Sequence, residues 1–502
     1  MAEAKSINNL NSLSGGDVRQ TDNLAIVDVS ACQTKKITVG DLKTALGVKN
    51  PALTYDATCN TAIKPTKGDN TASNDYSTVS GGDCNTASGR LSTVSGGEGN
   101  TSSDFSSTVG GGYCNNASFQ YSTVSGGGCN IALCGYSTVG GGACNTASGI
   151  RSTVGGGLCN TASDRGSTIS GGYYNTASSI RSTVGGGNGN TASGFYSTVS
   201  GGRSNTASGA CSTVGGGNGN TASLTCSTIS GGSQNTASCI GSTVGGGLCN
   251  IASCFYSTIG GGIRNTASWN CSTVSGGCCN TACGFSSTVG GGAFNTASGA
   301  CSTVSGGGSN TASGVCSTIG GGYDNTASGA CSTVSGGGCN TASGYCSTIG
   351  GGKCNTASGS RSTISGGNTN TASNNHSTVS GGCNNTASSI YSTVSGGCNN
   401  TASLSFSTIG GGCNNIASGN YSTVSGGRSN TASGTYSAIL GGSNNTAECA
   451  RSFIVGHDIT ARTSSALHVN NLLLETGSLP TSDPLVVGML YRSGTDIKIS
   501  LG

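Results

Sequence analysis

Small apolar residues recur along most of this chain at two fixed places in a fifteen-residue unit of the form S-T-V-S-G-G-G-x-N-T-A-S-G-x-x. The first serine of the unit recurs from Ser77 to Ser452 without an insertion or deletion. Counting from that serine, position 3 is valine or isoleucine in every unit, and position 11 is alanine in nearly all of them. Polar and apolar residues alternate in S-T-V and in N-T-A, which is typical of strands with one buried face.

The strict period indicates that each unit is one structural turn packed on the next. A Gly-Gly turn and a Ser-Gly turn separate the two short strands, so the unit predicts a flat roll with two walls. Helical repeats are disfavoured because the unit lacks leucine, glutamate and lysine. Collagen is excluded because glycine does not recur at every third residue. We therefore predict an all-β fold: a parallel β-solenoid, or β-roll, of about 26 fifteen-residue coils.

The predicted core is a ladder of β-branched side chains from position 3, facing the small alanine of position 11. This structural core ladder includes Val79, Val94, Val109, Val124, Val139, Ile169, Ile259, Val424 and Ile454. The asparagine of position 9 fits either a left-handed turn or an internal side-chain ladder. The core is thin, and the outward threonine and serine columns hardly vary, so we expect self-association into a homotrimer. At about 4.8 Å per coil, the array predicts a shaft of roughly 120 Å.

Both ends of the chain depart from the period. We divide the chain into an N-terminal attachment or capping region (1–69), the repeat shaft (70–452) and a β-rich C-terminal cap or tip (453–502). Capping regions are expected because a solenoid needs its open ends covered. Outside the repeat, the pattern predicts short strands at 24–29, 35–39, 467–474, 485–491 and 497–500, and a helical turn at 41–47.

Composition narrows the range of possible functions and partners further. Glycine supplies 92 residues and charged residues only 8%, a balance that suggests disorder unless a fixed period imposes order. The net charge of +3 gives no reason to expect a nucleic-acid partner or an anionic membrane surface. No run of eighteen apolar residues occurs, so we expect no membrane insertion. The first ten residues lack the apolar core of a secretory signal peptide.

Candidate catalytic residues are few. Asp83 and Glu98 share position 7 in adjacent coils, and a spacing of about 5 Å would match the carboxylate pair of a retaining glycosidase. The pair lies near one end of the array, without an aromatic cleft, so we interpret it as a surface pair. His376, His457 and His468 are dispersed and imply no catalytic triad. We therefore predict no catalytic residue and no enzymatic activity.

Cysteine is the unusual residue, with 27 copies that often share a position in successive coils. Such rows are Cys114, Cys129, Cys144 and Cys159; Cys301, Cys316, Cys331 and Cys346; and Cys383, Cys398 and Cys413. Neighbours about 5 Å apart are within disulfide range, but parallel side chains disfavour the bond, so we expect free thiols. The sequence has no pair of CxxC motifs at the spacing of a zinc site. The G-G-G-x-N phrase lacks the aspartate of calcium-binding nonapeptides. We predict neither cofactor nor metal.

Two sets of surface residues could each bind a ligand. Tyrosine recurs at position 15, as Tyr76, Tyr121, Tyr136, Tyr196, Tyr256, Tyr391, Tyr421 and Tyr436. These rings are either platforms for stacking sugars or ordinary exposed strand residues. The threonine and serine columns at positions 10 and 12 also resemble the flat faces of ice-binding solenoids.

The unit S-T-V-S-G-G-G-x-N-T-A-S-G-x-Y resembles the parallel β-roll repeats of trimeric adhesin heads in the YadA-like, or Hep/Hag, family. Those units are commonly fourteen residues long, one fewer than here. TDNLAIVDVSACQTKKITVGDL (21–42) resembles segments that open bacteriophage tail-fibre proteins. LPTSDPLVVGMLYRSGTDIKIS (479–500) is similar to closing segments of phage structural proteins.

Together these resemblances imply a structural fibre of a virion, a phage tail fibre that projects from the particle and mediates host attachment. Residues 1–69 would bind a tail or baseplate protein, and the fibre would contact a host cell-surface glycan or protein. Such a fibre would be assembled in the host cytoplasm and reside in the virion. The alternative is a bacterial trimeric surface adhesin, for which we expect a signal peptide and a membrane anchor that the sequence does not display. An ice-binding solenoid is the third interpretation.

Overall fold

The computed structural model describes residues 62–471 continuously, together with the segments 27–28, 33–34, 53–55, 480–482, 490–493 and 496–499. Within this described part, all regular elements are β-strands, and no helix suited to crossing a membrane is found. The strands form a parallel β-solenoid of about 27 turns with a spacing of roughly 15 residues, which confirms the predicted fold class. The chain divides into two compact units, Met1–Cys283 and Gly284–Gly502. The boundary between these units falls inside the predicted shaft.

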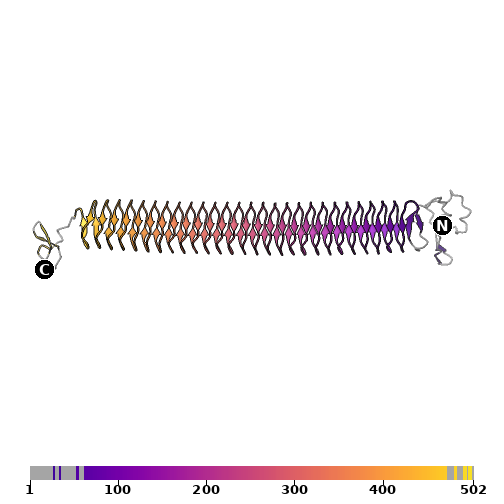
Figure 1. The fold of residues 1–502 in the computed structure, drawn as a ribbon, viewed down its shortest axis with the longest axis horizontal. Coiled ribbons are helices and arrows are strands. Elements are labelled where there is room, and N and C mark those ends of the chain that lie inside the picture. The colour runs from indigo at the N-terminus through magenta and orange to yellow at the C-terminus, as the bar shows by residue number, and fades with distance from the viewer. Residues whose placement is uncertain are drawn as a thin grey trace, which may run out of the picture. The chain divides into compact units, whose positions relative to one another are not determined.

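In the first unit, two parallel ladders run through the turns (Figure 1). One ladder has a two-residue strand at positions 2 and 3 of every repeat, from β6 (Thr78–Val79) and β8 (Thr93–Val94) to β32 (Thr273–Val274). The other uses positions 10 and 11, from β5 (Thr71–Ala72) to β33 (Thr281–Ala282). Pairing is in register, with each residue opposite the same position of the next turn, so every column of the repeat becomes a straight row of like side chains.

The second unit repeats this arrangement. Its strands run from β34 (Thr288–Val289) to β54 (Ala438–Ile439) in one ladder, and from β35 (Thr296–Ala297) to β55 (Thr446–Ala447) in the other. The ladders end with β56 (Phe453–Val455) and β58 (Leu467–Val469), and with β57 (Thr460–Ala461). In these last turns the register offset falls by one residue. A separate antiparallel pair joins β59 (Leu490–Ser493) and β60 (Asp496–Ile499).

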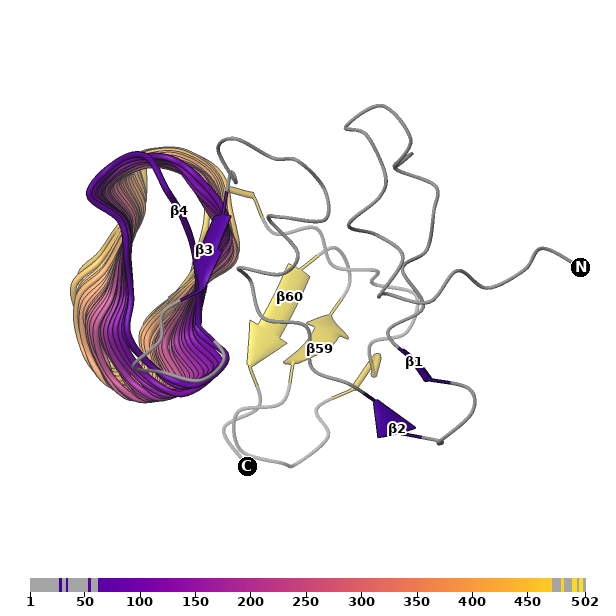
Figure 2. The same ribbon diagram turned by 90° about the vertical axis from the view of Figure 1, so that its right-hand side faces the viewer.

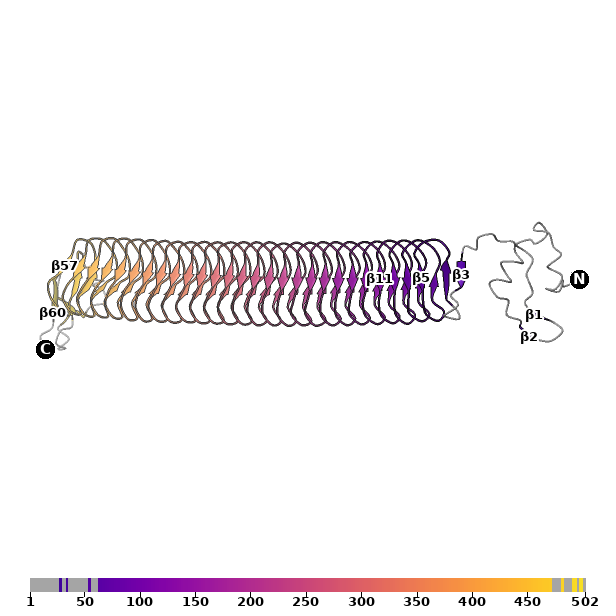
Figure 3. The same cartoon turned by 45° about the vertical axis from the view of Figure 1, so that its right-hand side comes forward.

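An antiparallel strand begins the solenoid of the first unit (Figure 3). β3 (Leu53–Tyr55) pairs with β4 (Ile63–Pro65), and β4 pairs in parallel with β6. β1 (Val27–Asp28) and β2 (Gln33–Thr34) form another antiparallel pair. Of the elements predicted outside the repeat, the helical turn at 41–47 and the strand at 35–39 lie outside the described residues. The predictions at 24–29, 467–474, 485–491 and 497–500 overlap β1, β58, β59 and β60.

Viewed end-on, each turn is an elongated closed loop (Figure 2). A third ladder of single-residue bridges completes it at position 7, starting with Asp83, Glu98 and Tyr113. The two-strand prediction missed this ladder because position 7 holds many residue types and shows no alternation with its neighbours. Its backbone bonds are nonetheless regular: the N–H of Asp83 donates to the carbonyl of Gly97, and the carbonyl of Asp83 accepts from the N–H of Gly99.

Four columns fill the interior. Position 3 is buried in every described turn, and all nine residues of the predicted core ladder are fully buried: Val79, Val94, Val109, Val124, Val139, Ile169, Ile259, Val424 and Ile454. The alanines of position 11 face them and are equally buried. The serines of position 1 and the asparagines of position 9 complete the interior, so half of the buried columns are polar.

The asparagine column forms an internal side-chain ladder, which resolves the open alternative at position 9. In a representative turn, the backbone N–H of Asn100 donates to Oδ1 of Asn85 at 3.0 Å. Its Nδ2 donates to the carbonyl of Gly96 in the same turn at 2.9 Å and to that of Gly112 in the next turn at 2.8 Å. Asn100 thus forms hydrogen bonds across three successive turns, which satisfies its own buried amide group.

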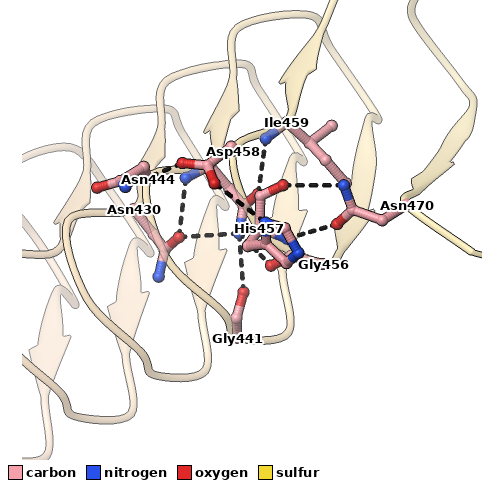
Figure 4. Close-up of polar contacts among 9 residues, drawn as sticks. Asn430, Gly441, Asn444, Gly456, His457, Asp458, Ile459 and Asn470 are labelled. Carbon is pink, nitrogen blue, oxygen red and sulfur yellow. Dashed lines mark hydrogen bonds and ion pairs between the residues drawn. The ribbon is translucent and has the colours of Figure 1, made fainter.

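This ladder ends where the repeat length changes (Figure 4). The N–H of Ile459 takes the place of the next asparagine and donates to Oδ1 of Asn445 at 3.0 Å. Asn470 then bonds to the backbone of His457 through both its Oδ1 and its Nδ2, at 2.6 and 3.0 Å. An apolar residue therefore closes the asparagine column without leaving its last acceptor unpaired.

Candidate binding surface

Sequence variation in the solenoid is concentrated at two corners of each turn, which we call the 7–8 edge (positions 7 and 8) and the 13–15 edge (positions 13 to 15). The threonine columns of positions 2 and 10 form the walls, are mostly half-buried and hardly vary. Among the described residues, the exposed aromatic side chains lie on these two edges, apart from Phe453 at the end of the array. The fold therefore separates a constant scaffold from variable, exposed edges.

The edges carry side chains where the backbone favours glycine. Positions 8 and 15 adopt left-handed backbone angles in nearly every turn, with φ of 58° at both Cys339 and Tyr436. Residues other than glycine and asparagine are uncommon in this region, because their Cβ approaches the backbone. A few turns do use glycine, such as Gly166 at position 15 and Gly219 at position 8. Most turns thus accept local strain in order to present a side chain, a pattern that often marks functional positions.

The 13–15 edge of the second unit carries a ladder of five stacked rings. Its members are His376, Tyr391, Phe406, Tyr421 and Tyr436. Neighbouring ring centroids are 4.7 to 5.1 Å apart, and the ring planes are within 12° of parallel. Each inner ring therefore has both faces covered by its neighbours. Within this ladder, the sugar-stacking hypothesis loses its physical basis, because the rings present edges and hydroxyl groups instead of free faces.

In the first unit, the same edge combines aromatic rings with arginines. Tyr121 stacks on Tyr136 with centroids 4.9 Å apart, and Phe105 meets Tyr121 edge-on. A guanidinium lies over each end of this group: Arg90 lies 5.8 Å from the Phe105 ring and Arg151 lies 5.8 Å from the Tyr136 ring. The ring faces are again covered, here by cations.

The thiol rows lie mainly on the two edges. All 25 described cysteines are free, and most are exposed or half-buried. Cys383, Cys398 and Cys413 pair through backbone bridges at position 7. Burial, followed by the neighbouring Cys383 and Cys413 thiols, raises the pKa of Cys398. Within the described residues, no three of the His, Cys, Asp and Glu side chains form a group suited to hold a metal ion.

Two other sequence candidates lie in adjacent turns. Asp83 and Glu98 pair through their backbones, and Oδ1 of Asp83 accepts the N–H groups of Asp69 at 2.9 Å and Cys84 at 3.0 Å. That oxygen is therefore already hydrogen-bonded by two backbone N–H groups of the protein. His376 belongs to the ring ladder, and Nε2 of His468 lies 3.4 Å from Oγ1 of Thr463.

His457 contacts Asp458 at the end of the array, with Nδ1 3.0 Å from Oδ2 (Figure 4). Asn444 donates to the other Asp458 oxygen at 2.9 Å. The Asn444 hydrogen bond, followed by that of His457, lowers the pKa of Asp458. These contacts join the last regular turn to the shortened one. They therefore fit a role of this segment in closing the end of the solenoid.

Comparison with known families matches residues 77–89 to the ubiquitous surface protein adhesin repeat. No curated protein matches the chain significantly. The matched segment runs from position 1 to position 13 of one unit, so it covers both strands and the position 9 asparagine. One unit of the chain is accordingly similar to an adhesin repeat, and the chain has a parallel β-solenoid fold. This similarity favours the adhesin interpretation over the phage tail fibre.

Proposed function

We propose that this protein is a non-enzymatic attachment protein whose solenoid presents two variable edges repeatedly to a target surface. The carrying observation is that strained, exposed side chains occupy positions 8 and 15 while the walls and interior stay constant. If the array served only as a spacer, glycine at these corners would relieve the left-handed strain. Repetition lets weak contacts add up to firm attachment.

A bacterial surface adhesin is the first candidate for the kind of attachment protein. Its support is the match of residues 77–89 to an adhesin repeat. A virion tail fibre is the second candidate, and its support is the likeness of segments 21–42 and 479–500 to phage structural proteins. Antibodies against the repeat distinguish the two: labelling of intact bacterial cells supports the adhesin, and labelling of purified particles alone supports the fibre.

We propose further that the chain acts as a homotrimer. The threonine columns of positions 2 and 10 are mostly half-buried and nearly invariant, although solvent would tolerate variation there. A wall that packs against another copy explains that constancy. Native mass determination tests it: three times the 48.3 kDa chain mass is expected, and a stable folded species of single-chain mass would refute the trimer.

Attachment itself is tested with beads coated with the purified protein. Glycine replaces the five ladder residues in the test variant: His376→Gly, Tyr391→Gly, Phe406→Gly, Tyr421→Gly and Tyr436→Gly. Because glycine permits left-handed backbone angles, we expect the variant to keep the solenoid fold, with some stability lost with the ring contacts, and to lose adhesion to target cells. The same change at position 8 of comparable turns tests the 7–8 edge separately: Thr369→Gly, Asn384→Gly, Asn399→Gly, Asn414→Gly and Ser429→Gly. Full adhesion by the ladder variant would contradict a role for the 13–15 edge, and full adhesion by the position 8 variant would contradict a role for the 7–8 edge.

A further inference from the structure

Three arginines occupy consecutive turns of the 13–15 edge in the first unit. Arg151 and Arg181 are at position 15, and Arg165 is at position 14 of the turn between them. All three side chains are exposed. The backbone N–H of Arg181 donates to the carbonyl of Arg165 at 2.9 Å, so these two residues are direct neighbours across turns. At about 4.8 Å per turn, the group covers roughly 10 Å along the edge.

The side chains on this edge hold two of the three guanidinium groups in place. Arg181 donates from Nη1 to the Tyr196 hydroxyl at 2.9 Å, and its guanidinium carbon lies 5.4 Å from the centre of that ring. Arg151 lies over the Tyr136 ring. Such stacking orients a guanidinium without using all of its N–H donors.

The charges near this group are almost all positive. Asp164 is the only acidic residue from 105 to 323. Its Oδ1 accepts the backbone N–H of Arg165 at 2.6 Å. Among the described residues, no ion pair includes Arg151, Arg165 or Arg181. Within the described part of the chain, the three guanidinium groups are therefore cationic groups without an ion-pair partner, in a chain that is poor in charge.

We propose that Arg151, Arg165 and Arg181 form a binding site for an acidic polysaccharide, recognised through its carboxylate or sulfate groups. Guanidinium groups bind both anions with paired N–H donors. One arginine per turn suits an extended sugar chain that lies along the edge and carries charged groups at regular intervals. Neutral sugars are disfavoured because Tyr121 and Arg151 cover the two faces of the Tyr136 ring. This inference rests on the proposed attachment function and names the class of ligand.

The test uses the full-length protein with three immobilised glycans: a heparin fragment for sulfate, polygalacturonate for carboxylate and dextran as the neutral control. The test variant is Arg151→Gln, Arg165→Gln and Arg181→Gln. Its control, with the same net charge, is Lys64→Gln, Lys67→Gln and Arg462→Gln, which lie outside the 7–8 and 13–15 edges. We expect the unmodified protein to bind one or both acidic glycans, and the test variant to lose roughly tenfold or more in affinity. The control variant should keep its affinity, and rising salt should weaken binding.

Binding to the heparin fragment alone, or to polygalacturonate alone, supports the site and identifies sulfate or carboxylate as its ligand group. Equal losses in the two triple variants would overturn the proposal, because only net charge would then matter. Dextran binding as tight as that of the acidic glycans, or no binding of either acidic glycan, would also overturn it. Failure here, with bead adhesion intact, would leave the attachment function standing and remove only this ligand class.

Discussion

Single residues decide whether the turns stack. Positions 5 and 6 are both glycine in most units, and the sequence does not distinguish them. In the structure, Gly337 at position 6 has φ of 89°, and a Cβ there would collide with the carbonyl oxygen of Gly352 in the next turn. Gly336 at position 5 has open space around its Cα. Two adjacent glycines thus serve different purposes: one permits close backbone approach and the other only forms a turn.

Gly337→Ala should therefore destabilise the protein, and Gly336→Ala should not. We expect the first change to lower the free energy of unfolding by about 1–3 kcal/mol, from left-handed strain and the clash with the next turn. The second should stay within about 0.5 kcal/mol of the parent protein. Urea unfolding followed by circular dichroism measures both, and equal effects of the two changes would contradict the close contact at position 6.

A second residue-scale prediction concerns the thiol row at position 7. Burial and then the thiols of Cys383 and Cys413 raise the pKa of Cys398, so less of it is thiolate at a given pH. The Cys383→Ser, Cys413→Ser variant removes the contribution of the neighbouring thiols to the raised pKa and leaves that of burial. The pH midpoint for alkylation of Cys398 by iodoacetamide, followed by mass spectrometry, should then move to lower pH. An unchanged midpoint would show that the neighbouring thiols have no influence.

At the scale of the element, a two-residue strand is too short to be stable by itself, and the buried asparagine ladder supplies what it lacks. Sequence periodicity was enough to predict both strands, their buried faces and the core from Val79 to Ile454. It did not determine the state of position 9, because asparagine suits both a ladder and a left-handed turn. The bridge at position 7 was also missed, since its bonds belong to the backbone and leave no trace in residue type.

Asn400→Ala should be among the most damaging substitutions in the second unit. Asn400 donates from Nδ2 to the carbonyls of Gly396 and Gly412, both at 2.9 Å, and its Oδ1 accepts from the N–H of Asn415. Removing the amide leaves the Gly396 carbonyl and the Asn415 N–H without this partner, at about 1–3 kcal/mol for each, while the Gly412 carbonyl keeps the N–H of Cys398.

The adjacent Asn399 offers a control, because its side chain forms an exposed row with Asn384 and Asn414. Asn399→Gly keeps the left-handed backbone accessible and should cost less than about 1 kcal/mol. Thermal unfolding of the two variants measures the difference. Equal losses of stability would mean that the buried ladder contributes no more than the surface row.

At the scale of the whole molecule, the repeat converts small local differences into long rows of like groups. Rows of thiols and rings arise because the register holds each position opposite itself in the next turn. The tyrosine column was visible in the sequence, but the coverage of its ring faces was not, because that depends on how side chains orient at left-handed corners. The arginine group was not apparent from the sequence for a different reason: Arg165 is at another repeat position than Arg151 and Arg181.

The most direct test of multivalent attachment through the edges is adhesion measured against the number of turns. Whole fifteen-residue units are removed in steps from residues 302–421, which preserves the register, and each purified chain is checked for cooperative unfolding. Bead adhesion to target cells should fall more steeply than in proportion to the turns removed, because contacts along the edge act together. Adhesion that stays constant across the series would place attachment outside these turns and contradict their proposed role.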